Sequence, residues 1–306
     1  MPVKKDKIII FGGSSFIGGK LIKYLKNDFE IINVSKKNKL KNIKNLNVDF
    51  SKNFSVQKFK NIKPKYIFFL TSLDHNMSEK DLTKSLQINF YSLCKILENK
   101  SIKSDLKGVI YLSTLQVYGD NKIISSEKIS TNPKNIYGLT HNLCEDYLKY
   151  FTNKNFINSL IFRISNSYGP PHLERENSFK NVTNDFIKSA FIKNKILIKS
   201  HGFFKRDFIY IDDLCKIIIR VFKNFKGYKI INLGSFESNS LIDIASKVKD
   251  VGEKYLKKKI DIEVLGNKPK IKKFKLVFKS NNKYKYNLTS FEKGILNTFK
   301  YLKKSK

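Results

Sequence analysis

The chain has 306 residues, of which 41% are hydrophobic and 13% are aromatic. This is enough apolar material for one large α/β domain or two packed lobes, so we do not expect a disordered chain. The net charge of +34 is typical of nucleic-acid binders, but the excess lysine is spread along the whole chain, so we predict solvated lysine faces and no nucleic-acid partner.

Short apolar segments alternate with amphipathic ones through the first half of the chain. We predict strands at Lys7–Phe11, Glu30–Val34, Leu46–Val48, Tyr66–Leu70, Gly108–Leu112 and Phe156–Arg163, and helices at Phe16–Lys26, Lys80–Glu98 and Ile136–Phe151. Unbroken apolar strands alternating with amphipathic helices are typical of a parallel sheet covered on both faces. The predicted fold class is therefore α/β, with a Rossmann-type doubly wound parallel sheet.

The rhythm changes after Gly169-Pro170-Pro171. Here we predict helices near Phe179–Lys193, Ile211–Phe225 and Leu288–Leu302, interleaved with short strands such as Lys195–Lys199 and Lys229–Leu233. This part is too irregular to extend the first sheet simply. We expect one domain over residues 1–170 and a smaller C-terminal α/β lobe over 171–306, packed on the first domain and partly interleaved with it.

The cysteines and the N-terminus bear on where the protein works. Cys94, Cys144 and Cys215 are far apart and form no CxxC pair, which is typical of reduced cysteines. The segment Met1–Lys7 has no apolar core of a signal peptide, and no apolar run reaches the roughly 18 residues of a membrane span. We therefore expect a cytoplasmic protein that has no membrane partner.

A glycine-rich segment lies where the first strand should turn into the first helix. Gly12 allows the tight turn, and Gly18 lets the helix lie close to the sheet. The helix start offers free N–H groups and a partial positive charge to a pyrophosphate. Because a strand precedes the motif and a helix follows it, the pattern predicts a dinucleotide site. Its predicted contacts are Gly12, Ser14, Ser15, Phe16, Ile17 and Gly18.

The end of the second strand bears on which dinucleotide binds. The acidic residue that would hold a ribose 2′-hydroxyl is missing, and the segment reads Ser35-Lys36-Lys37. A small hydroxyl followed by lysines suits a 2′-phosphate, which favours NADP over NAD. Asp49 follows the third strand and would accept a hydrogen bond from the adenine amino group. Further predicted cofactor contacts are Phe50, Leu70, Thr71, Ser72 and Asn89.

Several motifs together resemble the extended short-chain dehydrogenase/reductases, the NAD(P)-dependent nucleotide-sugar epimerase and dehydratase family. They are Gly-Gly-Ser-Ser-Phe-Ile-Gly at 12–18, Asn89, Tyr111–Gly119, Tyr137–His141, Arg163–Pro170, Arg206–Asp213 and Asn232-Leu-Gly234. The resemblance implies a dinucleotide-binding domain over 1–170 and a substrate-binding lobe over 171–306. It also implies a nucleotide-diphosphate sugar as substrate, and a homodimer paired through helices Lys80–Glu98 and Ile136–Phe151.

The resemblance implies catalytic roles for two hydroxyl groups. Thr114 would hydrogen-bond the reacting sugar oxygen. Tyr137 would be the general acid/base that moves a proton on that oxygen while hydride passes to or from the nicotinamide. An unperturbed tyrosine has a pKa of about 10, so this pKa must be lowered for work near neutrality.

Two residues depart from the family pattern. The family lowers the tyrosine pKa with a lysine one helical turn later, where this chain has His141. A branch of the family carries His at this position. An imidazolium would still lower the pKa of Tyr137 and bond the nicotinamide ribose, whereas a neutral imidazole would bond the ribose and supply no charge. Ser15 replaces the middle glycine, where it would either crowd the pyrophosphate or donate a hydrogen bond to it.

Substrate contacts are predicted in several separate segments of the chain. The resemblance places Asn166 and Arg206 on the substrate diphosphate, a task that suits the planar guanidinium fork. Arg206 has an alternative role in a salt bridge with Asp207 or Asp212. The loop containing Asp74 follows the fourth strand, where ligands of such sheets bind, and a solvated loop is the alternative. Point charges for a second phosphate clamp would be Lys270, Lys272 or Lys273. No spacing of His, Cys and carboxylates predicts a metal.

The two residues after Thr114 limit which reactions the protein could catalyse. Family members that eliminate water carry an Asp-Glu pair there, whereas this chain has Leu115 and Gln116. Neither can act as an acid or base, so a 4,6-dehydratase is disfavoured. A 4-epimerase, a 4-ketoreductase and a simple dehydrogenase remain open. A non-catalytic dinucleotide-binding sensor or partner protein of the same fold is the alternative from another class.

Overall fold

The computed structural model describes residues 5–36, 40–120, 123–124, 126–172, 179–267, 276–281 and 287–305. The chain divides into two compact units. The first comprises Met1–Asn121, Glu127–Ile164 and Cys215–Asn232, and the second comprises Lys122–Ser126, Ser165–Leu214 and Leu233–Lys306. A helix and a strand from late in the sequence therefore contribute to the first unit.

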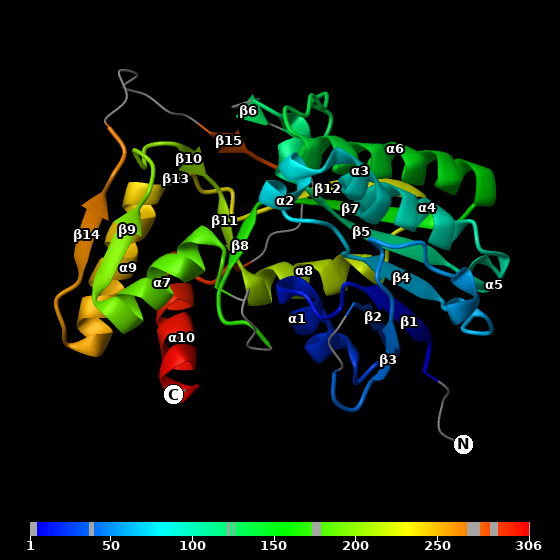
Figure 1. Ribbon diagram of the computed structural model, residues 1–306, viewed down its shortest axis with the longest axis horizontal. Coiled ribbons are helices and arrows are strands. Elements are labelled where there is room, and N and C mark those ends of the chain that lie inside the picture. Colours follow the sequence, from blue (N-terminus) through cyan, green and yellow to red (C-terminus); the bar gives the residue numbers. More distant parts are fainter. Residues whose placement is uncertain are drawn as a thin grey trace. The chain divides into compact units, whose positions relative to one another are not determined.

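A seven-stranded sheet, counted over the described residues, forms the middle of the first unit, in the order β12-β7-β5-β4-β1-β2-β3 (Figure 1). All pairings from β3 across to β7 are parallel. The predicted α/β fold with a Rossmann-type parallel sheet is confirmed. The strands are β1 (Lys7–Phe11), β2 (Glu30–Ser35), β3 (Lys44–Asn47), β4 (Tyr66–Phe69), β5 (Gly108–Thr114), β7 (Asn158–Ile164) and β12 (Tyr228–Leu233).

The edge strand β12 corrects one expectation. We assigned Lys229–Leu233 to the irregular second part, but β12 lies next to β7 in the large sheet. The helix before it, α8 (Ile211–Phe222), places Phe222 against Tyr66 and Phe68 of β4. The second part of the sequence does extend the first sheet, because a late helix and strand add one more crossover to it.

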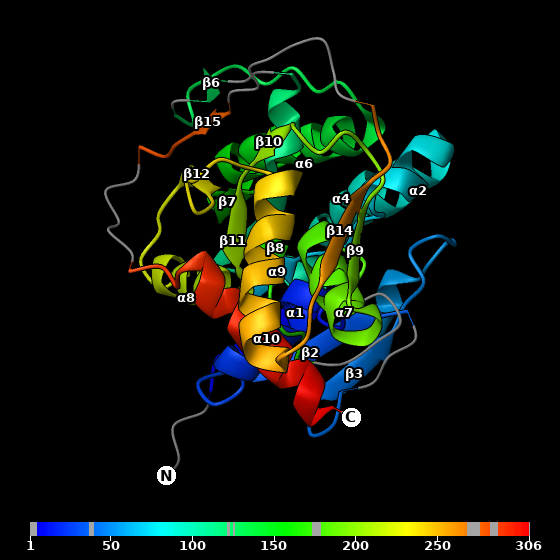
Figure 2. The ribbon, with the colours of Figure 1, turned by 90° about the vertical axis from the view of Figure 1, so that its left-hand side faces the viewer.

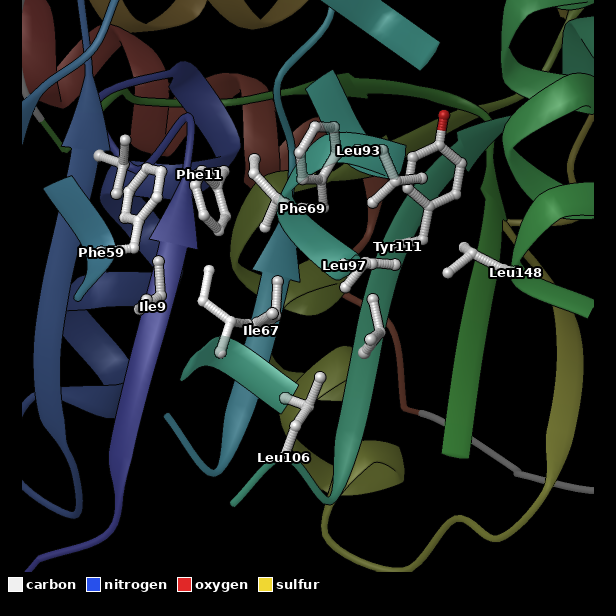
Figure 3. Packing of buried hydrophobic residues seen from close by; sticks show 14 of the residues in the cluster. Ile9, Phe11, Phe59, Ile67, Phe69, Leu93, Leu97, Leu106, Tyr111 and Leu148 are labelled. Carbon is white, nitrogen blue, oxygen red and sulfur yellow. The ribbon is translucent and has the colours of Figure 1, made fainter. Parts of the chain in front are cut away.

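Helices cover both faces of the sheet. On one face α4 (Ser92–Leu97) and α6 (Ile136–Asn155) bury leucines and phenylalanines against alternate residues of the strands. Figure 3 shows part of this cluster, in which Phe11 lies between Phe59 and Phe69, and Leu93 lies on the other side of Phe69. On the other face α1 (Phe16–Leu25) and α8 pack against the opposite set of strand residues. The period of two along each strand assigns its side chains to the two layers.

The predicted helix Lys80–Glu98 is broken in the structure. It consists of α2 (His75–Lys80), α3 (Leu82–Ser85), the π-helical turn η2 (Leu86–Tyr91) and α4. Asp81 has an extended backbone that ends α2, and its carboxylate accepts a hydrogen bond from Lys84 N that starts α3. The apolar period runs from Leu82 to Leu97 through α3, η2 and α4, so periodicity alone does not show the interruptions.

Two element ends also differ from expectation. Phe156 was assigned to a strand, but it ends α6 in the left-handed conformation and is 93% exposed. The last helix, α10 (Phe291–Lys304), begins at its Ser290 cap rather than at Leu288. The remaining short elements of this unit are η1 (Val56–Phe59), α5 (Lys100–Lys103) and η3 (Leu115–Tyr118).

The second unit packs three helices around small sheets. Phe299 of α10 lies against Phe191 of α7 and Tyr255 of α9, and these helices stand beside the parallel pair β9 and β14 (Figure 2). The elements are β6 (Ile123–Ile124), β8 (Asn166–Tyr168), α7 (Val182–Lys193), β9 (Lys195–Ile198), β10 (Lys205–Arg206), β11 (Phe208–Tyr210), β13 (Asn239–Ser240), α9 (Leu241–Leu256), β14 (Asp261–Val264) and β15 (Val277–Phe278).

Candidate active site

The glycine turn between β1 and α1 is held against the end of β4. Gly12 has a φ of +78°, and a Cβ there would lie 3.0 Å from the backbone of Leu70. A Cβ on Gly18 would lie 2.4 Å from the carbonyl oxygen of Gly12. Any side chain at either position would therefore push the turn, the helix and β4 apart.

Ser15 begins α1 as its N-cap. Its hydroxyl accepts a hydrogen bond of 3.1 Å from Gly18 N, which is the usual role of serine at this position. The backbone bond from Gly19 N to Ser15 O is the first of the helix. The amides of Phe16 and Ile17 precede it, so they belong to the helix-start groups that anions bind. Ser15 thus serves the turn itself, a role that neither sequence alternative included.

A buried polar network beneath the turn went unpredicted. Asn33, fully buried on β2, donates to Ser14 Oγ at 3.2 Å and to Asn45 Oδ1 at 2.8 Å, and Ser14 donates to Ser35 Oγ at 3.1 Å. A Cβ on Gly13 would lie 2.6 Å from Asn33 Oδ1. The sequence signal was available, since an asparagine inside an apolar strand needs buried partners.

The end of β2 combines a lysine with an aspartate. Lys36 Nζ lies 2.9 Å from Asp49 Oδ2. Burial raises the pKa of Asp49, but hydrogen bonds from Ser51 and Lys36 outweigh it and lower this pKa to about 2. Lys36 and Asp49, predicted at the phosphate and the adenine, are therefore brought together here. Lys37, like Lys270, Lys272 and Lys273, lies outside the described residues.

Thr114 and Tyr137 come from β5 and the start of α6. Thr114 is the last residue of β5, is 6% exposed, and accepts a hydrogen bond from Gln116 N at 3.2 Å. Asn135 caps α6 through Gly138 N at 2.7 Å and donates to Gln116 Oε1 at 2.9 Å. A Cβ on Gly138 would lie 2.6 Å from Gln116 O. The absent side chain at Gly138 thus lets α6 approach the turn after Thr114 closely.

Tyr137 is half-buried beside the end of β4. Burial raises the pKa of its phenol, a hydrogen bond from Ser72 opposes this rise, and the charge of Asp74 adds to it. The net shift is upward, so Tyr137 is a neutral phenol near pH 7. Ser72 follows Leu70 and Thr71 directly, so the strand end that supports the glycine turn also contacts Tyr137.

His141 lies one turn after Tyr137 on α6. The two rings make an edge contact with centroids 4.5 Å apart. The His141 side chain is buried, and its Nδ1 lies 2.7 Å from the hydroxyl of Tyr111 on β5. Burial lowers the pKa of His141 to about 3. Of the two alternatives drawn from the sequence, the structure therefore supports the neutral imidazole.

Asn89 joins three parts of the site and is fully buried. Its amide donates to Thr140 Oγ1 at 2.9 Å and accepts from Leu73 N at 2.8 Å. Thr140 in turn donates to Tyr137 O at 3.1 Å. The side chain that we predicted as a cofactor contact therefore ties α6 to the loop after β4.

Asp74 has a structural partner in the same loop. Its carboxylate accepts a hydrogen bond of 2.9 Å from Met77 N and caps α2. His75 follows it, with its ring 6.5 Å from that of Tyr137. The loop thus borders Tyr137, as expected for a segment at the carboxyl edge of the sheet.

A buried ion pair lies one turn after His141 on α6. Arg163 of β7 contacts Glu145 with its Nη2 2.6 Å from Oε2, and both side chains are almost wholly buried. Ser113 donates to the same carboxylate. Burial disfavours the charge on Arg163, but Glu145 outweighs this and raises the arginine pKa. Glu145 was missed because its partner is 18 residues away in sequence.

The predicted diphosphate contacts belong to the second unit. Asn166 donates from Nδ2 to Asp207 O at 3.0 Å, where β8 pairs with β11. Arg206 lies exposed on β10 and makes no ion pair within the described residues. The carboxylate of Asp207 accepts instead from Ser235 N at 2.9 Å. The alternative in which Asp207 holds Arg206 is therefore not what the structure shows.

The described ranges hold neither a membrane-spanning helix nor a metal cluster. No helix there is long and apolar enough to cross a lipid bilayer. No three His, Cys, Asp or Glu side chains there are arranged to hold a metal ion.

A comparison with known protein families agrees with the geometry of this site. Residues 8–234 match the model of the NAD dependent epimerase/dehydratase family. The chain belongs to this family. The match spans the glycine turn, Thr114, Tyr137 and His141, which the predicted resemblance had singled out, and it extends into the second unit as far as Gly234.

Proteins similar to this chain are named for different reactions. The chain is 28% identical over 262 residues to an ADP-L-glycero-D-manno-heptose-6-epimerase of Brachyspira hyodysenteriae, covering 80% of each chain. It is 28% identical over 259 residues to a dTDP-4-dehydro-6-deoxyglucose reductase of Escherichia coli, covering 79% of this chain and 80% of the other. A UDP-N-acetylglucosamine 4-epimerase of Methanobrevibacter ruminantium M1, solved with UDP-N-acetylmuramic acid, has a TM-score of 0.84 and 23% identity, covering 99% and 100%.

Proposed function

We propose that this protein is an NAD(P)-dependent oxidoreductase of a nucleotide-diphosphate sugar, a 4-ketoreductase or a 4-epimerase, with Tyr137 as acid/base. One observation carries the proposal. The glycine turn contacts Leu70 at the end of β4, and Asn89 ties the next residues of that segment to the first turn of α6, where Tyr137 lies, through Leu73 N and Thr140 Oγ1. A dinucleotide cradle and an acid/base group thus share one edge of the sheet, where ligands of such folds bind.

The residues fit a nicotinamide dinucleotide. Gly12 and Gly18 let the turn pack closely against β4 and α1, and the free amides at the start of α1 can bind a pyrophosphate. His141 Nε2 and Thr71 Oγ1 are buried polar atoms without a hydrogen-bond partner among the described residues. Such atoms are costly to bury unpaired, so a ligand that bonds them stabilises the site. His141 would hold the nicotinamide ribose, and Asp49 would accept a hydrogen bond from the adenine amino group.

The chemistry needs a proton at the sugar oxygen. When bound, the reduced dinucleotide supplies a hydride to the carbonyl carbon of a keto sugar. Tyr137 then donates its phenolic proton to the carbonyl oxygen and is reprotonated from solvent. Thr114 would hydrogen-bond the same oxygen and fix its position. The product is the secondary alcohol, so atoms and charges balance.

Between the two reactions, the site favours reduction. A neutral His141 supplies no charge to lower the pKa of Tyr137, which burial raises. A tyrosine that is protonated near pH 7 is ready as an acid, as reduction requires. An epimerase must also remove the proton from the alcohol, for which a raised pKa is unfavourable. Leu115 and Gln116, neither an acid nor a base, argue against dehydration.

We propose Arg206 and Asn166 of the second unit as contacts of the substrate diphosphate. Arg206 is exposed on β10 and free of ion pairs within the described part of the chain. Its fork can bind phosphate oxygens with two hydrogen bonds. Arg206→Ala should raise the KM for the nucleotide sugar and leave cofactor binding unchanged.

We propose NADP as the better of the two dinucleotides. β2 ends at Ser35 without a carboxylate that would repel a 2′-phosphate, and Lys36 follows. Because Lys36 already pairs with Asp49 at 2.9 Å, its contribution is modest. Lys36→Ala should weaken NADP binding about fivefold and NAD binding hardly at all. Lys23→Ala, which removes a charge from α1, is the matched control. Equal losses for both dinucleotides would contradict the assignment.

We also propose a homodimer. Apolar side chains are exposed on the helices expected to pair, namely Leu82, Tyr91, Leu139 and Tyr150, each at least 40% exposed. Exposed apolar groups on one set of helices favour association. Sedimentation of wild type and of Tyr91→Lys tests this, since a dimer through these helices should dissociate in the variant. A monomeric wild type would refute it.

Turnover separates the enzyme from the non-catalytic sensor. The protein is incubated with a panel of nucleotide-4-keto-sugars and NADPH or NADH, next to Tyr137→Phe. We expect loss of reduced cofactor with wild type and at least a hundredfold slower loss with the variant. If wild type binds the cofactor tightly, yet consumes none and isomerises no nucleotide sugar, the protein is a non-catalytic sensor and not an enzyme.

A further inference from the structure

Tyr111 contacts the residue that replaces the family's lysine. Its hydroxyl lies 2.7 Å from His141 Nδ1, and both side chains are at most 2% exposed. Figure 3 shows Tyr111 at the end of the apolar cluster, where it is the labelled side chain that carries an oxygen. Nε2, on the other side of the imidazole ring, is buried without a partner in the described chain.

In the hydrogen bond between Tyr111 and His141, the hydrogen should reside on the Tyr111 oxygen. Of the two groups, the phenol is the stronger acid and the imidazole nitrogen the stronger base, so the hydroxyl donates and Nδ1 accepts. Cys144 also lies near Tyr111, but its thiol donates to Asn89 O at 3.1 Å. A neutral imidazole has one donor and one acceptor nitrogen. With Nδ1 accepting, the hydrogen resides on Nε2.

We propose that Tyr111 is a positioning residue, which fixes His141 as the neutral Nε2–H tautomer and aims that N–H at a ribose hydroxyl of the bound dinucleotide. His141 then replaces the lysine as a hydrogen-bond donor but not as a cation. The identity of the acceptor rests on the proposed function, whereas the tautomer rests on this structure alone.

The surroundings of His141 support a neutral ring. Glu145, one turn after His141 on α6, is paired with Arg163 of β7 at 2.6 Å. Titratable groups on the elements around His141 include Tyr111 from β5, Tyr137 and Cys144 from α6, Cys94 from α4, Tyr118 from η3, and Asp74, His75 and Glu79 from α2 and its cap. Further along α6 lie Asp146, Tyr147, Lys149, Tyr150 and Lys154, with Glu98 and Tyr228 against them. Burial lowers the pKa of His141 to about 3, with no charged partner to oppose the fall.

Nitrogen NMR of the protein without cofactor tests the tautomer directly. The chain has four histidines, so ¹⁵N-histidine labelling gives a small set of ring signals, and His141→Gln identifies the one of interest. We expect a protonated Nε2 and an unprotonated Nδ1, unchanged from pH 8 down to about pH 5. A protonated Nδ1, or an imidazolium at neutral pH, would overturn the proposal. Neither result would depend on turnover, so failure here leaves the proposed function standing.

Two phenylalanine variants separate positioning from general stability. Tyr111→Phe removes the hydroxyl on His141, while Tyr118→Phe removes a hydroxyl that is equally buried and donates to Asn232 Oδ1, also at 2.7 Å. We expect Tyr111→Phe to mix the two His141 tautomers and weaken dinucleotide binding about tenfold, as loss of one aimed hydrogen bond would. Tyr118→Phe should do neither. Equal effects of both variants, or an unchanged tautomer in Tyr111→Phe, would refute the positioning role.

Discussion

A lysine at position 141 should change the acidity of Tyr137. The ring of His141 lies 4.5 Å from that of Tyr137. A unit charge about 5 Å from the phenolate, at an effective dielectric constant of about 20, stabilises it by about 3 kcal/mol. This corresponds to a fall of about two pKa units for Tyr137. His141→Lys therefore restores the charge that the neutral imidazole does not supply.

The pH profile of kcat/KM for ketone reduction measures this change. Reduction needs protonated Tyr137, so the rate falls as the pH rises through the tyrosine pKa. In His141→Lys this alkaline limb should move about two pH units lower. His141→Gln, which keeps a donor and adds no charge, should leave the limb in place. If the lysine variant folds, binds cofactor and keeps the wild-type limb, the role of position 141 as the control of Tyr137 acidity is refuted.

Three further experiments test the framework of the site. Gly18→Ala places a Cβ 2.4 Å from Gly12 O, so cofactor binding measured by calorimetry should fall at least tenfold, and unchanged binding would contradict the turn geometry. The pKa of His141 is lowered in the folded state, so the unfolded chain binds a proton that the folded protein does not. Wild type should therefore lose stability as the pH falls below about 6.5, by about 2 kcal/mol at about pH 5 relative to His141→Gln. Thermal-unfolding temperatures that fall in parallel for the two proteins would contradict a neutral buried ring. Glu145→Gln leaves Arg163 buried without its counterion and should cost about 3 kcal/mol in urea unfolding, and a loss below about 1 kcal/mol would show that this pair is not required.

Local pattern was sufficient to predict the frame of the site. The glycine turn at Gly12 is visible because a strand, a tight turn and a helix follow one another within about a dozen residues. Thr114 and Tyr137 were placed by the motifs around them. The structure brings both to the carboxyl edge of the sheet, where β5 ends and α6 begins. Each of these features depends on neighbours in sequence.

Features that depend on distant partners were not predictable. The charge state of His141 follows from its burial and from Tyr111, 30 residues earlier. The role of Asn89 depends on Thr140, 51 residues later, and on the π-helical turn that a continuous apolar period conceals. The strand β12 joined the large sheet because of its partner β7, which no local signal in Lys229–Leu233 reveals.

We propose that hydride passes to a sugar carbon on this protein while Tyr137 supplies the proton. The most direct measurement uses NADPH deuterated at the transferring position, together with the nucleotide-4-keto-sugar panel, and follows the product by mass spectrometry. We predict one deuterium on the carbon of the former ketone with wild type and none above background with Tyr137→Phe. Cofactor bound at the glycine turn, yet no deuterium in any product and no epimer formed, would contradict the account.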